Sequence, residues 1–212
     1  MRHRNAALLA FGVLALAQPT RAATVQYTDV LPLTTTNWAD VASVPKFDPG
    51  LGVLTSVTLE LAGHVEGSAA FESLDAQAAT VTMNLAAEIE IQRPDLSTLV
   101  TVLPLATTVD NVDAFDGVID FAGASGRSYD DLAGDDTDAF YTTAPGDLAL
   151  FTGQGMIDLP AIATGASSGS GAGNLILQFG TSASAEVRII YGYDEVVPVD
   201  ERSWGSIKQQ YR

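Results

Sequence analysis

Aspartates are concentrated between positions 110 and 147, and this cluster is the first feature of the sequence that could carry chemistry. Calcium binds about six to eight oxygen ligands, and loops often supply them through the short aspartate side chain. The spacing matches neither the EF-hand loop nor the glycine-rich calcium-binding repeat. We therefore expect solvated acidic loops without a cofactor, with calcium binding as the alternative. The candidate ligands are Asp110, Asp113, Asp116, Asp120, Asp130, Asp131, Asp135, Asp136 and Asp138.

The sequence offers one candidate for a catalytic serine. Residues 165–169 read Gly-Ala-Ser-Ser-Gly, which matches the Gly-x-Ser-x-Gly pattern around Ser167. The match lies in a Gly/Ser-rich tract without a following helix, and a triad would have to use His64, the sole histidine after residue 22. Glycosidases use a pair of carboxylates, but among 26 acidic residues such pairs occur by chance, so they do not indicate a glycosidase here. We expect a protein without enzymatic activity; a secreted hydrolase is the remaining alternative.

Aromatic side chains could form a platform on which sugar rings stack. Packing in a core or against a sheet is the expected role of most of them. Together with the aspartates they define an alternative function, a calcium-dependent carbohydrate-binding module. The five aromatic candidates are Trp38, Tyr129, Tyr141, Tyr191 and Tyr193.

The net charge of the chain is −16, and removal of three arginines within the first 22 residues leaves a net charge of −19. Such a surface repels nucleic acid and anionic lipid, so neither is an expected partner. The sequence contains no cysteine, which excludes disulfides, cysteine-based metal sites and cysteine nucleophiles.

The N-terminus has the features of a secretory signal peptide, predicted over residues 1–22. Basic residues Arg2 and Arg4 precede an apolar run at 6–17, which is too short to span a bilayer. Small residues allow cleavage before Gln18 or, as we favour, before Ala23. No later segment is apolar for long enough to span a membrane, so the mature chain is expected to be secreted, extracellular or held at the cell surface.

Period-2 alternation of apolar and polar residues dominates the rest of the chain. Residues 80–92 show it most clearly, and residues 57–61, 175–179 and 185–193 repeat it. One-sided alternation predicts antiparallel sheets with one buried face. We predict an all-β fold, an antiparallel two-sheet sandwich of jelly-roll type with about eight to ten strands. Shorter strands are expected at 99–103, 148–152 and 156–159, and residues 165–173 are expected to form a mobile loop.

The predicted domain covers residues 23–193, followed by an acidic linker and short tail over 194–212. Within Ser203–Arg212, one or two helical turns would place Trp204, Ile207 and Tyr211 on one face.

Several blocks resemble the bacterial choice-of-anchor E domain family. They include Phe47–Val57, Phe71–Ser73, Leu150–Gly155 and, most specifically, the Asp-Gly-x-x-Asp-Phe-x-Gly-x-Ser-Gly block at residues 116–126. The resemblance covers roughly residues 25–193 and implies an exported bacterial domain, often followed by a variable C-terminal sorting signal. It implies no catalytic residue. The tail here lacks the apolar helix of the common Pro-Glu-Pro type of signal.

These observations predict an exported, non-catalytic structural or adhesive β-sandwich at the cell surface or outside the cell. Its partners would be envelope or matrix components or glycans.

Overall fold

The computed structural model describes residues 20–196, and residues 1–19 and 197–212 lie outside the described part. The predicted helical turns of the tail therefore lie outside it, as does most of the predicted signal peptide. The elements in chain order are β1 (Thr20–Thr35), β2 (Trp38–Pro45), β3 (Gly52–Ser73), β4 (Ala79–Gln92), β5 (Thr98–Val102), β6 (Leu105–Val112), β7 (Gly126–Thr142), α1 (Pro145–Phe151), β8 (Met156–Gly165), β9 (Ser168–Ser170) and β10 (Leu175–Val196).

The strands form two packed antiparallel sheets. The first sheet, sheet A, has the order β1-β10-β3-β7. Sheet B has the order β2-β8-β4-β5, and β6 and β9 also pair with β4. The chain crosses between the sheets at most of its connections, and the first strand β1 and the last strand β10 are neighbours in sheet A. This is the jelly-roll order, and the predicted fold class is confirmed.

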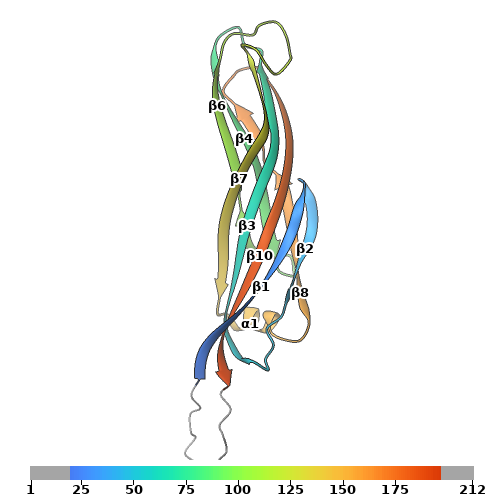
Figure 1. The fold of residues 1–212 in the computed structure, drawn as a ribbon, viewed down its shortest axis with the longest axis vertical. Coiled ribbons are helices and arrows are strands. Elements are labelled where there is room, and N and C mark those ends of the chain that lie inside the picture. Colours follow the sequence, from blue (N-terminus) through green and yellow to red (C-terminus); the bar gives the residue numbers. More distant parts are fainter. Residues whose placement is uncertain (1–19, 197–212) are drawn as a thin grey trace, which may run out of the picture.

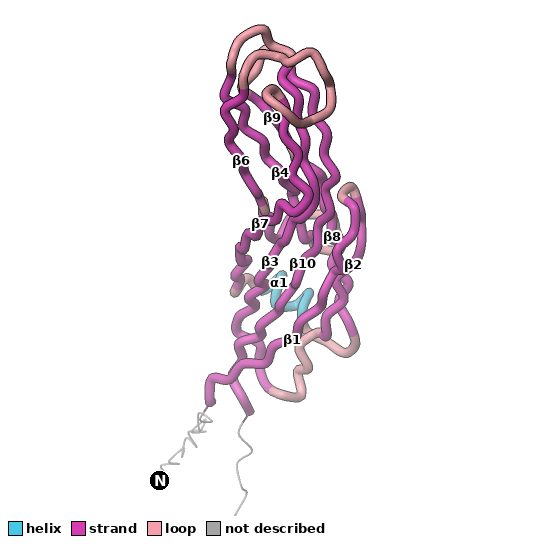
Figure 2. The backbone as a smooth tube through the Cα atoms, turned by 45° about the horizontal axis from the view of Figure 1, so that its top comes forward, coloured by secondary structure: helices cyan, strands magenta, loops and turns pink. Residues whose placement is uncertain are grey.

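The sandwich is long and narrow, with all strands running roughly along its length (Figure 1). Its central strands β3 and β10 have 22 residues each and pair along almost their whole length. At about 3.3 Å per residue, such a strand is roughly 70 Å long. Thr20 at the start of β1 pairs with Val196 at the end of β10, so both ends of the described chain leave from the same end. Loops gather at the opposite end (Figure 2).

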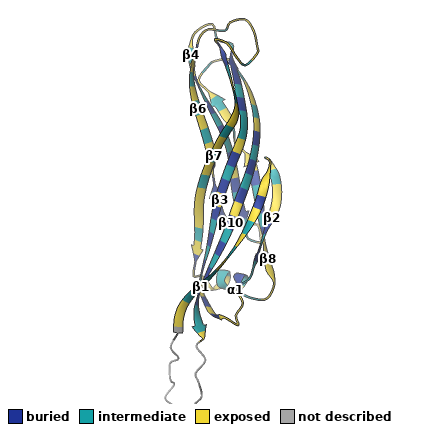
Figure 3. Cartoon of the chain, in the orientation of Figure 1, coloured by how far each residue is buried: buried dark blue, intermediate teal, exposed yellow. Residues whose placement is uncertain are grey.

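Alternating side chains fill the space between the sheets. On β4 the buried set is Val81, Met83, Leu85, Ala87, Ile89 and Ile91, which confirms the alternation seen in the sequence. Buried and less buried residues likewise alternate along β3 and β10 (Figure 3). Tyr191 is the largest fully buried side chain, and its hydroxyl donates a 2.8 Å hydrogen bond to the carbonyl oxygen of Pro45.

Local structure differs from expectation in several places. The strand expected at 148–152 is mostly helix α1, because Pro145 fits the first turn and Asp147 places a negative charge in that turn, where it is favourable. The expected mobile loop at 165–173 contains β9, which pairs with β4. At the ends, β10 continues three residues beyond Tyr193, and β1 includes Thr20–Ala22, which the favoured cleavage site would remove.

Candidate functional site

A histidine–carboxylate cluster lies on the outer face of sheet A. His64 lies in the middle of β3. Its Nδ1 is 2.7 Å from Asp135 Oδ1 on the neighbouring edge strand β7, and its Nε2 is 3.5 Å from Glu66 Oε2. The hydrogen bond to Asp135 raises the pKa of His64, partial burial opposes the rise, and Glu66 adds to it. The side chain of His64 therefore links the central strand β3 to the edge strand β7 through Asp135.

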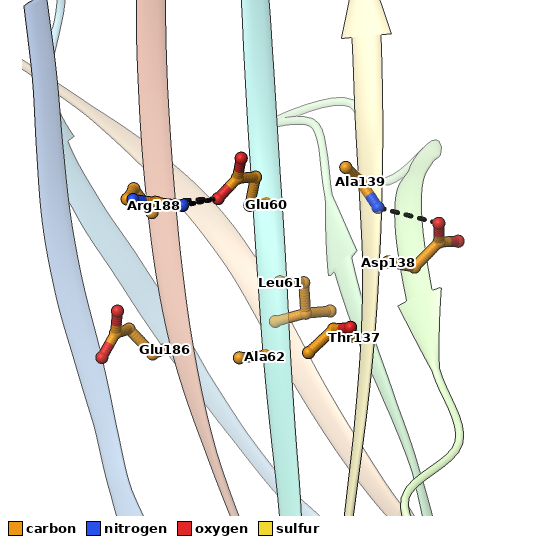
Figure 4. A pocket seen from close by; sticks show the side chains of 8 residues that line it. All are labelled: Glu60, Leu61, Ala62, Thr137, Asp138, Ala139, Glu186 and Arg188. Atoms are coloured by element: carbon orange, nitrogen blue, oxygen red, sulfur yellow. Dashed lines mark hydrogen bonds and ion pairs between the residues drawn. The ribbon is translucent and has the colours of Figure 1, made fainter.

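Two adjoining shallow hollows lie on the same sheet face. One, of about 480 Å³, is bordered by an ion pair between Glu60 and Arg188, whose Nε is 2.8 Å from Glu60 Oε2 (Figure 4). The other, of about 460 Å³, reaches His64. Both hollows share Ala62, Thr137 and Glu186. Small side chains at Ala62 and Thr137 thus leave a depression bordered by the charged side chains of Glu60, Arg188 and Glu186.

The nine candidate calcium ligands are spread along the rod. Asp110 lies on β6, where its carboxylate accepts a 2.6 Å hydrogen bond from Tyr129. The next three aspartates lie in the loop of residues 113–125, and the last five lie on β7. The expectation that this last group forms a loop is wrong, because β7 pairs with β3 over these residues. Within residues 20–196, no group of three or more His, Cys, Asp or Glu side chains could hold a metal ion.

A buried carboxylate anchors the loop of residues 113–125, which lies at the end opposite the termini. Glu72 is 0 % exposed, and its carboxylate accepts a hydrogen bond from the backbone N–H of Phe121 (2.8 Å) and one from the hydroxyl of Ser125 (2.5 Å). Ser125 is buried as well. The sequence pattern marked neither Glu72 nor Ser125 as a site residue. Their signal lay in the Phe-Glu-Ser and Ser-Gly blocks of the family resemblance.

The aspartates of this loop bond to the loop's own backbone. Asp116 accepts hydrogen bonds from the N–H groups of Val118 (3.0 Å) and Ala124 (3.4 Å). Asp120 accepts one from the N–H of Ala122 (3.0 Å). Gly117 has φ +96°, which an L side chain rarely adopts. The loop is therefore held in a fixed conformation by its own acidic side chains.

Ser167 and His64 are not brought together. The Ser167 hydroxyl lies 2.9 Å from that of Thr181, and it accepts a 3.1 Å hydrogen bond from the N–H of Ala86. His64 bonds to Asp135 and Glu66 instead. Ser167 thus fixes the segment before β9 against β4.

Of the five aromatic candidates for sugar stacking, four are at least half-buried. Tyr191 and Tyr193 belong to the core, and Trp38 donates a 3.2 Å hydrogen bond to the carbonyl of Ala183. Tyr129 bonds to Asp110. Tyr141 alone among the five is exposed, at 64 %, and it lies on β7 two residues from Ala139 at the hollow of Figure 4.

The topology and this site define the class: a jelly-roll sandwich with a charged, hollowed sheet face and a fixed loop at one end. Comparison with models of known protein families and with curated proteins finds no match for the chain. Among solved structures it aligns with the VP2 subviral particle of infectious bursal disease virus at 16 % identity and a TM-score of 0.18. That alignment covers 85 % of this chain and 38 % of the viral chain. The Gx strain of the same virus aligns at 13 % identity and a TM-score of 0.18, over 91 % and 42 % of the two chains.

The chain thus spans about two fifths of the length of these capsid proteins, and at such TM-scores the likeness carries no argument about function. Within residues 20–196, no helix is long and apolar enough to cross a membrane.

Proposed function

We propose that this protein is an exported, non-catalytic structural or adhesive domain that holds a loop away from the surface to which its chain ends attach. The observation that carries the proposal is that the mature chain would enter and leave at one end of the rod, because Ala23, the first residue after the favoured cleavage site, pairs with Tyr193. Because both ends leave there, attachment through either of them would project the opposite end by roughly the length of a 22-residue strand, about 70 Å.

The projected loop supports an adhesive role. Val118 and Ile119 are each 55 % exposed within it. Their backbone is fixed by Asp116, Asp120 and Glu72, so little conformational entropy would be lost on contact. A fixed loop with two exposed apolar side chains suits contact with an envelope or matrix component.

Export is inferred from the sequence of residues 1–22, and a location outside the cell or at its surface is proposed with it. The test is to produce the full chain in a bacterial host and to fractionate the cells. We expect processed protein outside the cytoplasm, with a mass that identifies cleavage before Gln18 or Ala23. Unprocessed protein confined to the cytoplasm would overturn the export part of the proposal.

Adhesion is tested separately with a loop variant that carries two substitutions and a control variant that carries one. Val118→Ser with Ile119→Ser should reduce attachment of cells or coated beads to envelope or matrix preparations. Val53→Ser is the control, because Val53 is 63 % exposed near the chain ends. Equal attachment by the loop variant and the wild type would remove the adhesive role and leave a spacer.

A second candidate is carbohydrate binding on the outer face of sheet A. It is favoured by exposed Tyr141 beside the Glu60–Arg188 hollow, where a ring and charged groups could contact one sugar. A glycan array would test it: binding that disappears in Tyr141→Ala supports it, and absence of binding to any glycan contradicts it.

A further inference from the structure

The open sides of the sandwich carry backbone groups that another strand could pair with. In sheet A the edge strands are β1 and β7, and β2 is an edge of sheet B. An edge strand is a template for a strand of another molecule unless side chains or charges block it.

Asp29 blocks the side formed by β1 and β2. Its Oδ1 accepts a hydrogen bond from the N–H of Val30 (3.0 Å), the next residue on its own strand. Its Oδ2 accepts a hydrogen bond from the N–H of Ser43 on β2 (2.7 Å). One carboxylate thus occupies an edge amide and also joins the two sheets.

Asp136 has the same arrangement on the opposite side. Its Oδ1 accepts a hydrogen bond from the N–H of Thr137 (2.9 Å), again the next residue on the strand. Its Oδ2 accepts one from the N–H of Leu103 (2.7 Å), just after β5 in sheet B. On each open side of the sandwich, one aspartate therefore joins the two sheets and also accepts the N–H of the next residue on its own edge strand.

Two further aspartates occupy edge amides without bridging the sheets. Asp40 Oδ1 accepts the N–H of Val41 on β2 (2.8 Å), and Asp138 Oδ1 accepts the N–H of Ala139 on β7 (2.8 Å). Both aspartates are exposed. The same bond, from residue i+1 to the carboxylate of residue i, thus recurs on β1, β2 and β7.

We infer that these sheet edges are self-association surfaces for a second copy of this chain, and that the four aspartates keep them closed. A second copy is the fitting partner because two identical edges can pair in the antiparallel sense about a two-fold axis. Two-fold symmetry is the commonest symmetry of homo-oligomers. Val30 and Val41, exposed by 62 % and 46 %, would gain cover in such a pair. The aspartates oppose it in two ways, since they occupy the amides and place like charges against each other.

The test uses Asp40→Ala combined with Asp138→Ala, because neither aspartate bridges the sheets and the fold should persist. Sedimentation velocity over a wide concentration range should show a monomeric wild type and a variant that shifts to dimers and larger species. Circular dichroism establishes that the variant is folded. Hydrogen exchange should show added protection at the amides of Val41 and Ala139 in the associated form.

Two controls distinguish the effect of freeing the edge amides from the effect of removing negative charge. Asp130→Ala with Asp131→Ala removes the same charge from exposed positions of β7 and should stay monomeric. Asp40→Asn with Asp138→Asn keeps an acceptor oxygen at each amide and should also stay monomeric. A folded alanine pair that remains monomeric overturns the inference, and so does equal association of either control. None of these outcomes depends on whether the protein is exported.

Discussion

Replacing Glu72 with alanine should destabilise the protein by about 2–4 kcal/mol, because a buried donor and a partly buried donor would lose their acceptor, at about 1–3 kcal/mol for the buried one and toward the lower end for the other. The donors are the N–H of Phe121 and the hydroxyl of Ser125, and Glu72 and Ser125 are both fully buried. Domains of this kind have roughly 5–15 kcal/mol of stability, so the loss would be large. Glu72→Gln keeps one acceptor oxygen and should lose about half as much.

Urea unfolding followed by circular dichroism measures the free-energy change, and limited chymotrypsin digestion measures loop order through cleavage at Phe115 and Phe121. We expect faster cleavage at these sites in Glu72→Ala than in the wild type. Glu88→Ala is the control, because Glu88 is an exposed carboxylate on β4 and should change stability by less than about 0.5 kcal/mol. A Glu72→Ala loss below about 1 kcal/mol, with wild-type cleavage, would refute the assigned anchoring role.

The remaining predictions concern a tyrosine, a histidine and a metal. Tyr191→Phe removes the bond to Pro45 and should lose about 1 kcal/mol in thermal unfolding; because burial raises the pKa of Tyr191, wild-type stability should fall as pH rises above the ordinary tyrosine pKa of about 10, and the variant should lack that fall. The hydrogen bond to Asp135 raises the pKa of His64, so the stability that this pair contributes should be complete below about pH 6.5 and should disappear as the pH rises through the raised pKa. The variant His64→Gln should flatten that pH dependence in melting curves. Added calcium should leave the melting temperature unchanged, whereas a site at a hundredfold its Kd would contribute about 2.7 kcal/mol and a clear upward shift.

Much of the fold followed from local pattern. Alternation at 80–92 predicted both the strand β4 and which of its side chains are buried, because the two-residue period of a strand relates each position directly to a face. Alternation at 185–193 did the same for the second half of β10. One-sided alternation also predicted antiparallel sheets, which the strand pairings show.

The acidic segment could not be assigned in the same way. Residues 130–138 have few apolar side chains, so composition favoured a loop, although β3 pairs with them along β7. As an edge strand β7 needs little burial, and its exposed carboxylates suit an edge. Helix α1 was missed for a related reason: its seven residues are too few to show a helical period.

The sequence by itself determined the all-β class, the acidic surface and the buried faces of the longest strands, because each depends on composition or on neighbours along one strand. Only the tertiary structure decided what the aspartates contact. Asp29 meets Ser43 and Asp136 meets Leu103 across the gap between the sheets, and Glu72 meets Ser125 from 53 positions away. Such contacts depend on how strands from the two sheets and the end loops come together, which no local pattern records.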